Sequence, residues 1–184
     1  MLGPPGSGKG TQAKIIANEC GIYHISTGDC LRTEMQAGSD IGKKISGIIA
    51  SGGLVSDDIV NDLIMQHTHP RPHFNGCLFD GYPRTKAQAV FLDQLLSDRG
   101  ETISVVIDLD VDSESLVQRI LERGKSSGRL DDTESVIRKR LEVYESITAE
   151  LKVYYQKQGK LQIISGIHSI EDTASKIQHI IDHL

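Results

Sequence analysis

Apolar and polar positions along this chain follow two patterns that alternate. Short runs rich in apolar and β-branched residues occupy positions 22–25, 77–79, 104–109 and 161–165. Amphipathic segments with a helical period separate them. Strands that alternate with helices favour a parallel sheet covered by helices, so we expect an α/β fold in three layers.

Local signals also predict where several helices begin and end. The first helix is expected over 8–20, with Gly21 as its left-handed stop. Thr85 is predicted to cap a helix that reaches Leu96, and Ser169 to open the last helix. These ends bound the segments that separate the predicted strands.

Two insertions interrupt the alternation. Short helices predicted at 27–37, 40–51 and 56–66 follow one another without a strand between them, so residues 26–55 are expected to form a small lobe. The helical pattern breaks again at 123–133, where a short flap is expected.

Composition narrows the class of protein. A chain of 184 residues suits one compact domain, and a net charge of −5 argues against a nucleic-acid-binding surface. Three separated cysteines with no C-x-x-C pair disfavour disulfides and a zinc site. No apolar stretch is long enough to span a membrane. We therefore expect a cytoplasmic protein without zinc, and a monomer.

The glycine-rich sequence GPPGSGKGTQ at positions 3–12 is the strongest signal for function. Its backbone N–H groups, the N-terminus of the helix that follows and the charge of Lys9 all favour phosphate, so the predicted ligand is a nucleoside polyphosphate. A buried strand normally precedes such a P-loop, but only Met1 and Leu2 stand there. Either residues are absent or the strand is very short. Counting it, the sheet would have about five strands.

The loop departs from the common pattern at Gly10, which replaces the hydroxyl side chain that usually binds Mg²⁺. Thr11 comes one position later. Asp80 follows the apolar run at 77–79, where the carboxylate that orients Mg²⁺ through water is expected. Asp80 is also compatible with an ordinary strand-end turn.

Six arginines lie beside predicted loops or the flap, and their planar forks suit phosphate oxygens. Arg119 and Arg123 are four positions apart and share a helix face, where like charges repel unless an anion lies between them. The six are Arg32, Arg84, Arg119, Arg123, Arg129 and Arg140. Such a set is expected where phosphoryl groups are transferred between nucleotides.

Four motifs in order resemble those of the adenylate kinases: 3–12, then HISTGD at 24–29 with Arg32, then FDGYPRT at 79–85 with Gln88, then RG at 123–124 with GRLDD at 128–132. They span nearly the whole chain, and four ordered motifs are far more specific than one. The resemblance implies reversible transfer between Mg·ATP and AMP, giving two ADP, with 26–55 as the AMP lobe and 123–133 as a short lid.

The resemblance also implies roles for individual residues. Lys9, Arg84, Arg123, Arg129 and Arg140 would act in catalysis as electrostatic clamps, and Asp80 would orient Mg²⁺ through water. ATP would meet Gly6, Ser7, Gly8, Lys9, Gly10, Thr11, Arg119, Arg123 and the backbone near His168. AMP would meet Thr27, Arg32, Gly53, Leu54, Val55, Gly81, Tyr82, Pro83, Arg84, Gln88, Arg129 and Arg140.

Two other functions stay open. The short flap also resembles the uridylate-cytidylate kinases, although Thr85 and Gln88 favour the adenylate kinase pattern over the Asn that pyrimidine enzymes typically place after the arginine. A P-loop switch that binds nucleotide without transferring phosphate is compatible with Gly10, but it leaves Arg32 and Arg84 without a purpose. Asp131 and Asp132 fit sugar hydroxyls, flap arginines or a helix cap equally well.

Overall fold

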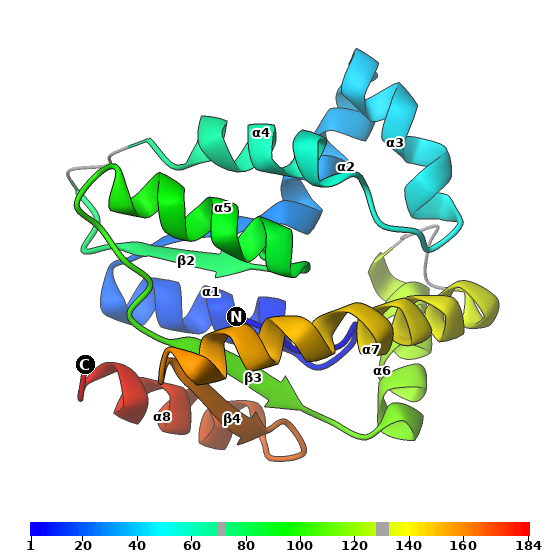
Figure 1. Cartoon of the computed structure of the whole chain (residues 1–184). Helices are drawn as coiled ribbons and strands as arrows, with labels where there is room; N and C mark the ends of the chain where they lie inside the picture. Colours follow the sequence, from blue (N-terminus) through cyan, green and yellow to red (C-terminus); the bar gives the residue numbers. More distant parts are fainter. Residues whose placement is uncertain (70–72, 128–132) are drawn as a thin grey trace.

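The computed structural model describes residues 1–69, 73–127 and 133–184, in which strands and helices alternate as expected (Figure 1). The strands of this described part are β1 (Tyr23–Ser26), β2 (Cys77–Asp80), β3 (Val106–Asp110) and β4 (Leu161–Ser165). Its helices are α1 (Lys9–Cys20), α2 (Thr27–Ala37), α3 (Asp40–Ala50), α4 (Asp57–His67), α5 (Lys86–Ser97), α6 (Ser113–Ser127), α7 (Glu134–Lys157) and α8 (Ile170–Ile181). The predicted α/β class is confirmed.

The strands form two parallel pairs, β1 with β2 and β3 with β4. Leu2 lies beside β3: its N–H donates to the Ile107 carbonyl at 2.7 Å, and its carbonyl accepts from Leu109 at 3.0 Å. The Met1 amino group donates to the Phe79 carbonyl of β2 at 2.5 Å. Two residues thus connect the pairs. In the described chain, the strand expected before the loop is a single bridge between Leu2 and Asp108.

Side chains of β3 point alternately into two helical layers, as the period of a strand requires. Ile107 and Leu109 pack with buried residues of α1 and α8, whereas Val106 packs with residues of α5 and α7. Asp108 is fully buried on the same face as Val106, where Lys152 of α7 meets its carboxylate. The strands therefore lie between two layers of helices.

Three predicted helix ends, at Gly21, Thr85 and Ser169, are confirmed. Gly21 ends α1 in a left-handed conformation at φ 61°. The Thr85 hydroxyl accepts a hydrogen bond from the N–H of Gln88 at 3.1 Å, which caps α5. The Ser169 hydroxyl accepts from Asp172 at 3.1 Å at the start of α8. These caps satisfy N–H groups that have no partner inside the helix.

The three predicted short helices are present as α2, α3 and α4, and α2 and α3 project together from the rest of the molecule (Figure 1). Their backbones approach closely at Gly42. A Cβ atom there would lie 2.1 Å from the carbonyl oxygen of Glu34, a distance that no side chain can occupy. Ile45 of α3 is fully buried in the cluster that continues into α4 and α5.

The helical pattern that was expected to break near Arg123 continues to Ser127, so that boundary was wrong by four residues. Leu116, Val117 and Ile120 give α6 a buried stripe against α7, which holds the helix past Gly124 despite the roughly 1 kcal/mol that glycine costs in a helix. Residues 128–132 of the predicted flap lie outside the described residues.

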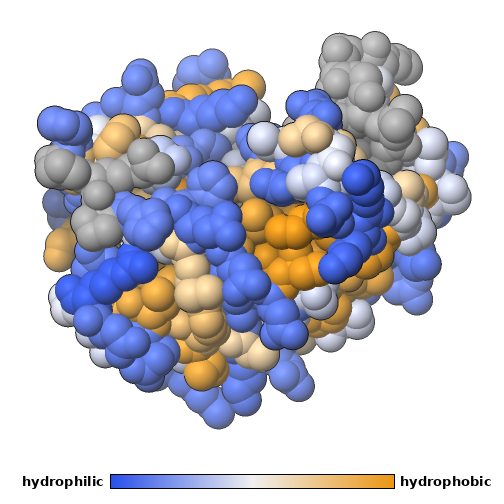
Figure 2. Space-filling model, turned by 90° about the horizontal axis from the view of Figure 1, so that it is seen from above, coloured by the Kyte–Doolittle hydropathy of each residue, from blue (hydrophilic) through white to orange (hydrophobic). Residues whose placement is uncertain are grey.

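The face of the molecule seen from above is largely hydrophilic, with hydrophobic residues exposed between the hydrophilic ones (Figure 2). Among the residues that the structure describes, none of the helices combines the length and the apolar character that a membrane span requires.

Candidate functional site

The glycine-rich loop joins Leu2 to α1 through a tight turn. Gly6 and Gly8 have φ values of 83° and 93°, which L side chains rarely adopt. A Cβ atom at Gly6 would also lie 2.6 Å from a side-chain carbon of Ile120 in α6. The N–H groups of Thr11 and Gln12 donate to the Gly8 carbonyl at 3.0 Å, so α1 begins directly behind the loop. This is the geometry that presents backbone N–H groups to an anion.

Lys9 folds back over this loop. Its Nζ atom donates to the carbonyls of Gly3 at 2.6 Å and Pro4 at 2.9 Å. Surrounding protein removes water from the ammonium and, with smaller contributions from Arg84 and Arg140, outweighs the attraction of Asp80 and lowers the Lys9 pKa to about 8. A phosphate group beside Lys9 would favour the charged ammonium and raise this pKa.

A cavity of about 1170 Å³ opens over the loop and extends to the lobe of α2 and α3. Pockets for one small molecule have volumes of roughly 300–1,000 Å³, so this cavity has room for more than one such ligand. Its lining joins Lys9 and Thr11 on one side to Thr27, Arg32 and Gln88 on the other. The site thus has two halves that share one space.

Five of the six predicted arginines line the cavity. They come from separate elements: Arg32 from α2, Arg84 from the segment after β2, Arg119 and Arg123 from α6, and Arg140 from α7. Arg129 lies outside the described residues. The structure therefore concentrates positive charge from distant parts of the chain around a single volume, despite the protein's net charge of −5.

The arginines influence one another electrostatically. The pKa of Arg84 is lowered by the protein that surrounds its guanidinium and then by the charge of Arg140. The Nε atom of Arg84 donates to the Gly81 carbonyl at 2.9 Å, which fixes the side chain in the cavity. Arg32 is held by Asp29 three residues earlier. Cations that are close enough to disfavour each other's charge are arranged to receive an anion.

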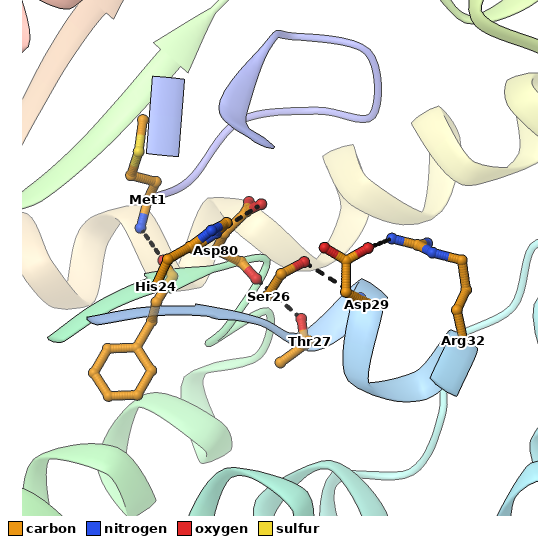
Figure 3. A network of polar contacts seen from close by, with 8 residues as sticks. Met1, His24, Ser26, Thr27, Asp29, Arg32 and Asp80 are labelled. Carbon is orange, nitrogen blue, oxygen red and sulfur yellow. Dashed lines mark hydrogen bonds and ion pairs between the residues drawn. The ribbon is translucent and has the colours of Figure 1, made fainter. Parts of the chain in front are cut away.

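Asp80 ends β2 within the same cavity, beside β1 (Figure 3). His24 Nε2 lies 3.6 Å from its Oδ2 atom, and Thr27 donates to its backbone carbonyl at 3.1 Å. Burial by itself would raise the Asp80 pKa, but the nearby His24 imidazole and the charge of Lys9 outweigh it, so the pKa lies below its usual value. The carboxylate is ionised at neutral pH.

Gly10 lies next to this carboxylate, since a Cβ atom at that position would be 3.4 Å from Asp80 Oδ2. The missing side chain leaves space between the loop and Asp80. Within residues 1–69, 73–127 and 133–184, no three His, Cys, Asp or Glu side chains come together as a metal-binding group. The carboxylate of Asp80 beside this space suits Mg²⁺ that keeps its waters and takes phosphate oxygens as ligands.

Most residues predicted for the second half of the cavity also line it: Thr27, Arg32, Gly53, Leu54, Val55, Gly81, Pro83, Arg84, Gln88 and Arg140. The predicted loop residues Gly6, Gly8, Lys9, Gly10 and Thr11 do so as well. Of the predicted residues that the structure describes, three are not among the lining. Ser7 and Tyr82 are buried, and His168 is exposed outside the cavity.

Tyr82 has a different environment from the one expected for it. Its side chain is fully buried, and its hydroxyl donates to Asn61 Oδ1 at 2.6 Å and to the Gln88 carbonyl at 3.2 Å. It therefore connects α4 to α5 beneath the cavity. Near His168, Arg119 donates to the Gly166 carbonyl at 3.1 Å, which ties the loop after β4 to the cavity wall.

Sequence reasoning missed the wall formed by α7. Val143, Tyr144, Ile147 and Thr148 line the cavity, yet their spacing is that of an ordinary buried helix face. It also missed Asp57 at the start of α4, whose carboxylate accepts hydrogen bonds from the side chains of Thr85 and Gln88. Neither role leaves a signal in a single sequence, because both depend on which elements pack together.

Comparison with known proteins points the same way as this geometry. A family model described as adenylate kinase matches residues 1–160. A protein of Maricaulis maris named adenylate kinase is 48% identical over 96% of this chain and 94% of its own length. Proteins with the same name from Bacteroides fragilis and Xanthomonas campestris pv. campestris are 45% and 46% identical, over 100% and 96% of this chain and 97% and 95% of theirs.

Proposed function

The chain belongs to the adenylate kinase family of nucleoside monophosphate kinases, and on that premise we propose that it catalyses the reversible reaction of ATP with AMP to give two ADP. One observation carries the proposal. A single cavity is lined both by the glycine-rich loop and by a second set of residues, among them Thr27, Arg84 and Gln88. A nucleotide switch needs only the first set.

In this proposal the two halves of the cavity hold two nucleotides. The loop residues Gly6 to Thr11, with Arg119 and Arg123, bind the phosphates of ATP. Thr27, Arg32, the backbone at 53–55, the segment 81–84 and Gln88 surround AMP. The proposal keeps 26–55 as the AMP-binding lobe and 123–133, with Arg129, as the lid. Because Ser7 and Tyr82 are buried, their part is to hold the binding residues in place. The backbone near His168 meets ATP.

Catalysis then consists of alignment and charge neutralisation. The phosphate of AMP attacks the γ-phosphorus of ATP, the bond to the β–γ bridging oxygen breaks, and ADP leaves from both sides. No side chain need act as a nucleophile. Lys9, Arg84, Arg123 and Arg140 stabilise the charge on the transferred phosphoryl group, because they are already held around the cavity before the reaction.

Magnesium is the cation that this chemistry requires, and the residues present fit it. Asp80 would hold it through bound waters, in the space that Gly10 leaves open. When bound, the ion neutralises charge on the β- and γ-phosphates. Asp80 keeps its own negative charge at neutral pH because His24 and Lys9 lower its pKa.

Phosphorus NMR of the protein with Mg·ATP and an equimolar mixture of AMP, CMP and UMP tests the proposal. The expected result is loss of AMP and growth of ADP, with CMP and UMP unchanged. Phosphorylation of CMP or UMP instead would assign the protein to the pyrimidine kinases. Bound ATP without any transfer would favour the nucleotide switch.

A further inference from the structure

Asp57 joins the lobe of short helices to the helix that carries Gln88. It is the first residue of α4, and its carboxylate accepts two hydrogen bonds from side chains at the start of α5. Thr85 Oγ1 donates to its Oδ2 at 2.9 Å, and Gln88 Nε2 donates to its Oδ1 at 2.7 Å. Asp57 itself is not part of the cavity lining, whereas Gln88 is.

Contacts on all sides fix the buried side chain of Gln88, which is 3% exposed. Its Oε1 accepts from the backbone N–H of Arg84 at 2.7 Å while its Nε2 faces Asp57. Its backbone is held as well, by the hydroxyls of Thr85 and Tyr82. A reversed amide would place an oxygen against the carboxylate and an NH₂ group against an N–H donor. The amide therefore has one orientation.

An amide in a fixed orientation retains one N–H and one lone pair for a ligand, since each end has used one of its two. The ring edge of adenine offers a nitrogen acceptor beside an amino donor. Hypoxanthine has the same shape, but its edge offers an N–H donor beside a carbonyl acceptor. A single amide orientation can pair with one of these patterns and not with the other in the same place.

We propose that Asp57 is a positioning residue for base selection: by fixing the amide of Gln88, it makes the acceptor half of the cavity select bases with an amino group over those with a carbonyl group. The inference rests on the proposed function, because it takes Gln88 to face the base of the acceptor nucleotide. Asp57 suits this part because an ionised carboxylate only accepts hydrogen bonds. It cannot stabilise the reversed amide.

The test compares AMP with IMP, whose base is hypoxanthine, as acceptors at fixed Mg·ATP. In Asp57→Asn the new NH₂ group is able to donate to Gln88 Oε1, so one of the two contacts that oppose the reversed amide is removed, while the N–H of Arg84 still disfavours it. We expect the ratio of kcat/KM for AMP to that for IMP to fall about tenfold, the effect of one hydrogen bond, through a higher KM for AMP. The KM for ATP should stay within about twofold.

Asp58→Asn is the matched control, because Asp58 is the exposed neighbour in the same helical turn and its replacement removes the same charge. It should leave the ratio unchanged. Thr85→Val is a second variant: it removes the other hydrogen bond of Asp57 together with the cap on the N–H of Gln88, and it keeps the carboxylate. The ratio should move in the same direction by about threefold, less than a full hydrogen bond is worth.

Outcomes separate the two proposals. An unchanged ratio in Asp57→Asn, whether or not both rates fall, overturns the part assigned to Asp57, because general damage to the fold lowers both acceptors alike. If Asp57→Asn does not fold, an unchanged ratio in Thr85→Val overturns it. A wild-type protein that phosphorylates neither AMP nor IMP overturns the proposed function itself.

Discussion

The Nζ atom of Lys9 lies 2.6 Å from the carbonyl oxygen of Gly3, so the backbone of the glycine-rich loop holds the ammonium group of its own lysine. Two carbonyls hold the ammonium, but the surrounding protein still lowers its pKa to about 8. A polyphosphate in the loop would place negative charge beside Lys9 and raise that pKa again. Binding and protonation at this site are therefore coupled.

ATP binding is expected to take up protons around pH 8 and above, and its affinity should fall as the pH rises above about 8. The sign follows from a Lys9 pKa that is lower in the free protein than in the complex. Isothermal titration calorimetry in buffers of different ionisation enthalpy measures the protons taken up. Lys9→Arg keeps a charge that does not titrate in this range, so its affinity should stay level. Equal pH dependence in both proteins would contradict the assignment.

The same pKa shift predicts a change in stability without ligand. The folded-state pKa of Lys9 lies below the unfolded value near 10.5, so the unfolded chain binds more protons between about pH 8 and pH 10.5. The contribution of Lys9 to the free energy of unfolding should therefore rise with pH across this window. Denaturant unfolding of the wild type and Lys9→Met measures it as the difference between the two pH profiles. A free energy of unfolding of the wild type that falls relative to that of Lys9→Met as the pH rises would have the wrong sign.

Removal of a clamp should cost catalysis more than folding. Lys9→Ala or Arg84→Ala is expected to lower kcat/KM by a hundredfold or more, on the order of 3 kcal/mol of transition-state stabilisation. Lys86→Ala is the control, because Lys86 is exposed two residues beyond Arg84 and is not part of the cavity lining. Steady-state rates with Mg·ATP and AMP provide the comparison. Either variant within about threefold of the wild type would rule out its part in catalysis.

Gly42 and Gly47 of α3 provide a matched pair for the packing of the lobe. In Gly42→Ala the new methyl group meets the Glu34 carbonyl, so α2 and α3 must separate, and we expect a loss of about 1–3 kcal/mol in the free energy of unfolding. Among the described residues, a Cβ atom at Gly47 would lie in open space, so Gly47→Ala should stabilise the helix by up to about 1 kcal/mol. Urea unfolding of both variants distinguishes them. Equal effects would mean that the close approach does not exist in solution.

Lys152 Nζ lies 2.6 Å from the carboxylate of the fully buried Asp108, and this ion pair joins α7 to β3. Lys152→Met should destabilise the fold by about 2–3 kcal/mol, at the low end for a buried pair because the lysine side chain is one-third exposed. Lys157→Met, at an exposed position of the same helix, should change stability by less than about 0.5 kcal/mol. Thermal or urea unfolding measures both, and similar small losses would show that the pair contributes nothing.

Much of the fold could be predicted because its signals are local. Runs of β-branched residues, the cap at Thr85 and the stop at Gly21 each act within a few residues, and the structure has them where they were expected. The end of α6 was misjudged because Gly124 weakens the local helical signal while packing of Ile120 against α7 maintains the helix. That packing is a long-range effect.

The site residues also differ in whether their signal is local or depends on long-range packing. The loop, Asp80 and the arginines could be predicted, because their residue types and motifs carry the chemistry. The buried part of Tyr82 and the bonds of Asp57 could not, because each depends on α4 lying against α5. The predicted residues that line the cavity belong to recognisable sequence motifs, whereas the residues that hold them in place are visible only in the fold.

The ratio of products formed to AMP consumed tests most directly whether the two halves of the cavity exchange a phosphoryl group. Purified protein is incubated with Mg·ATP and AMP, and ADP and inorganic phosphate are measured at early times. Direct transfer predicts two ADP for each AMP lost and no inorganic phosphate. One ADP and one phosphate for each ATP lost, with AMP unchanged, would mean hydrolysis and would contradict a cavity built for two nucleotides.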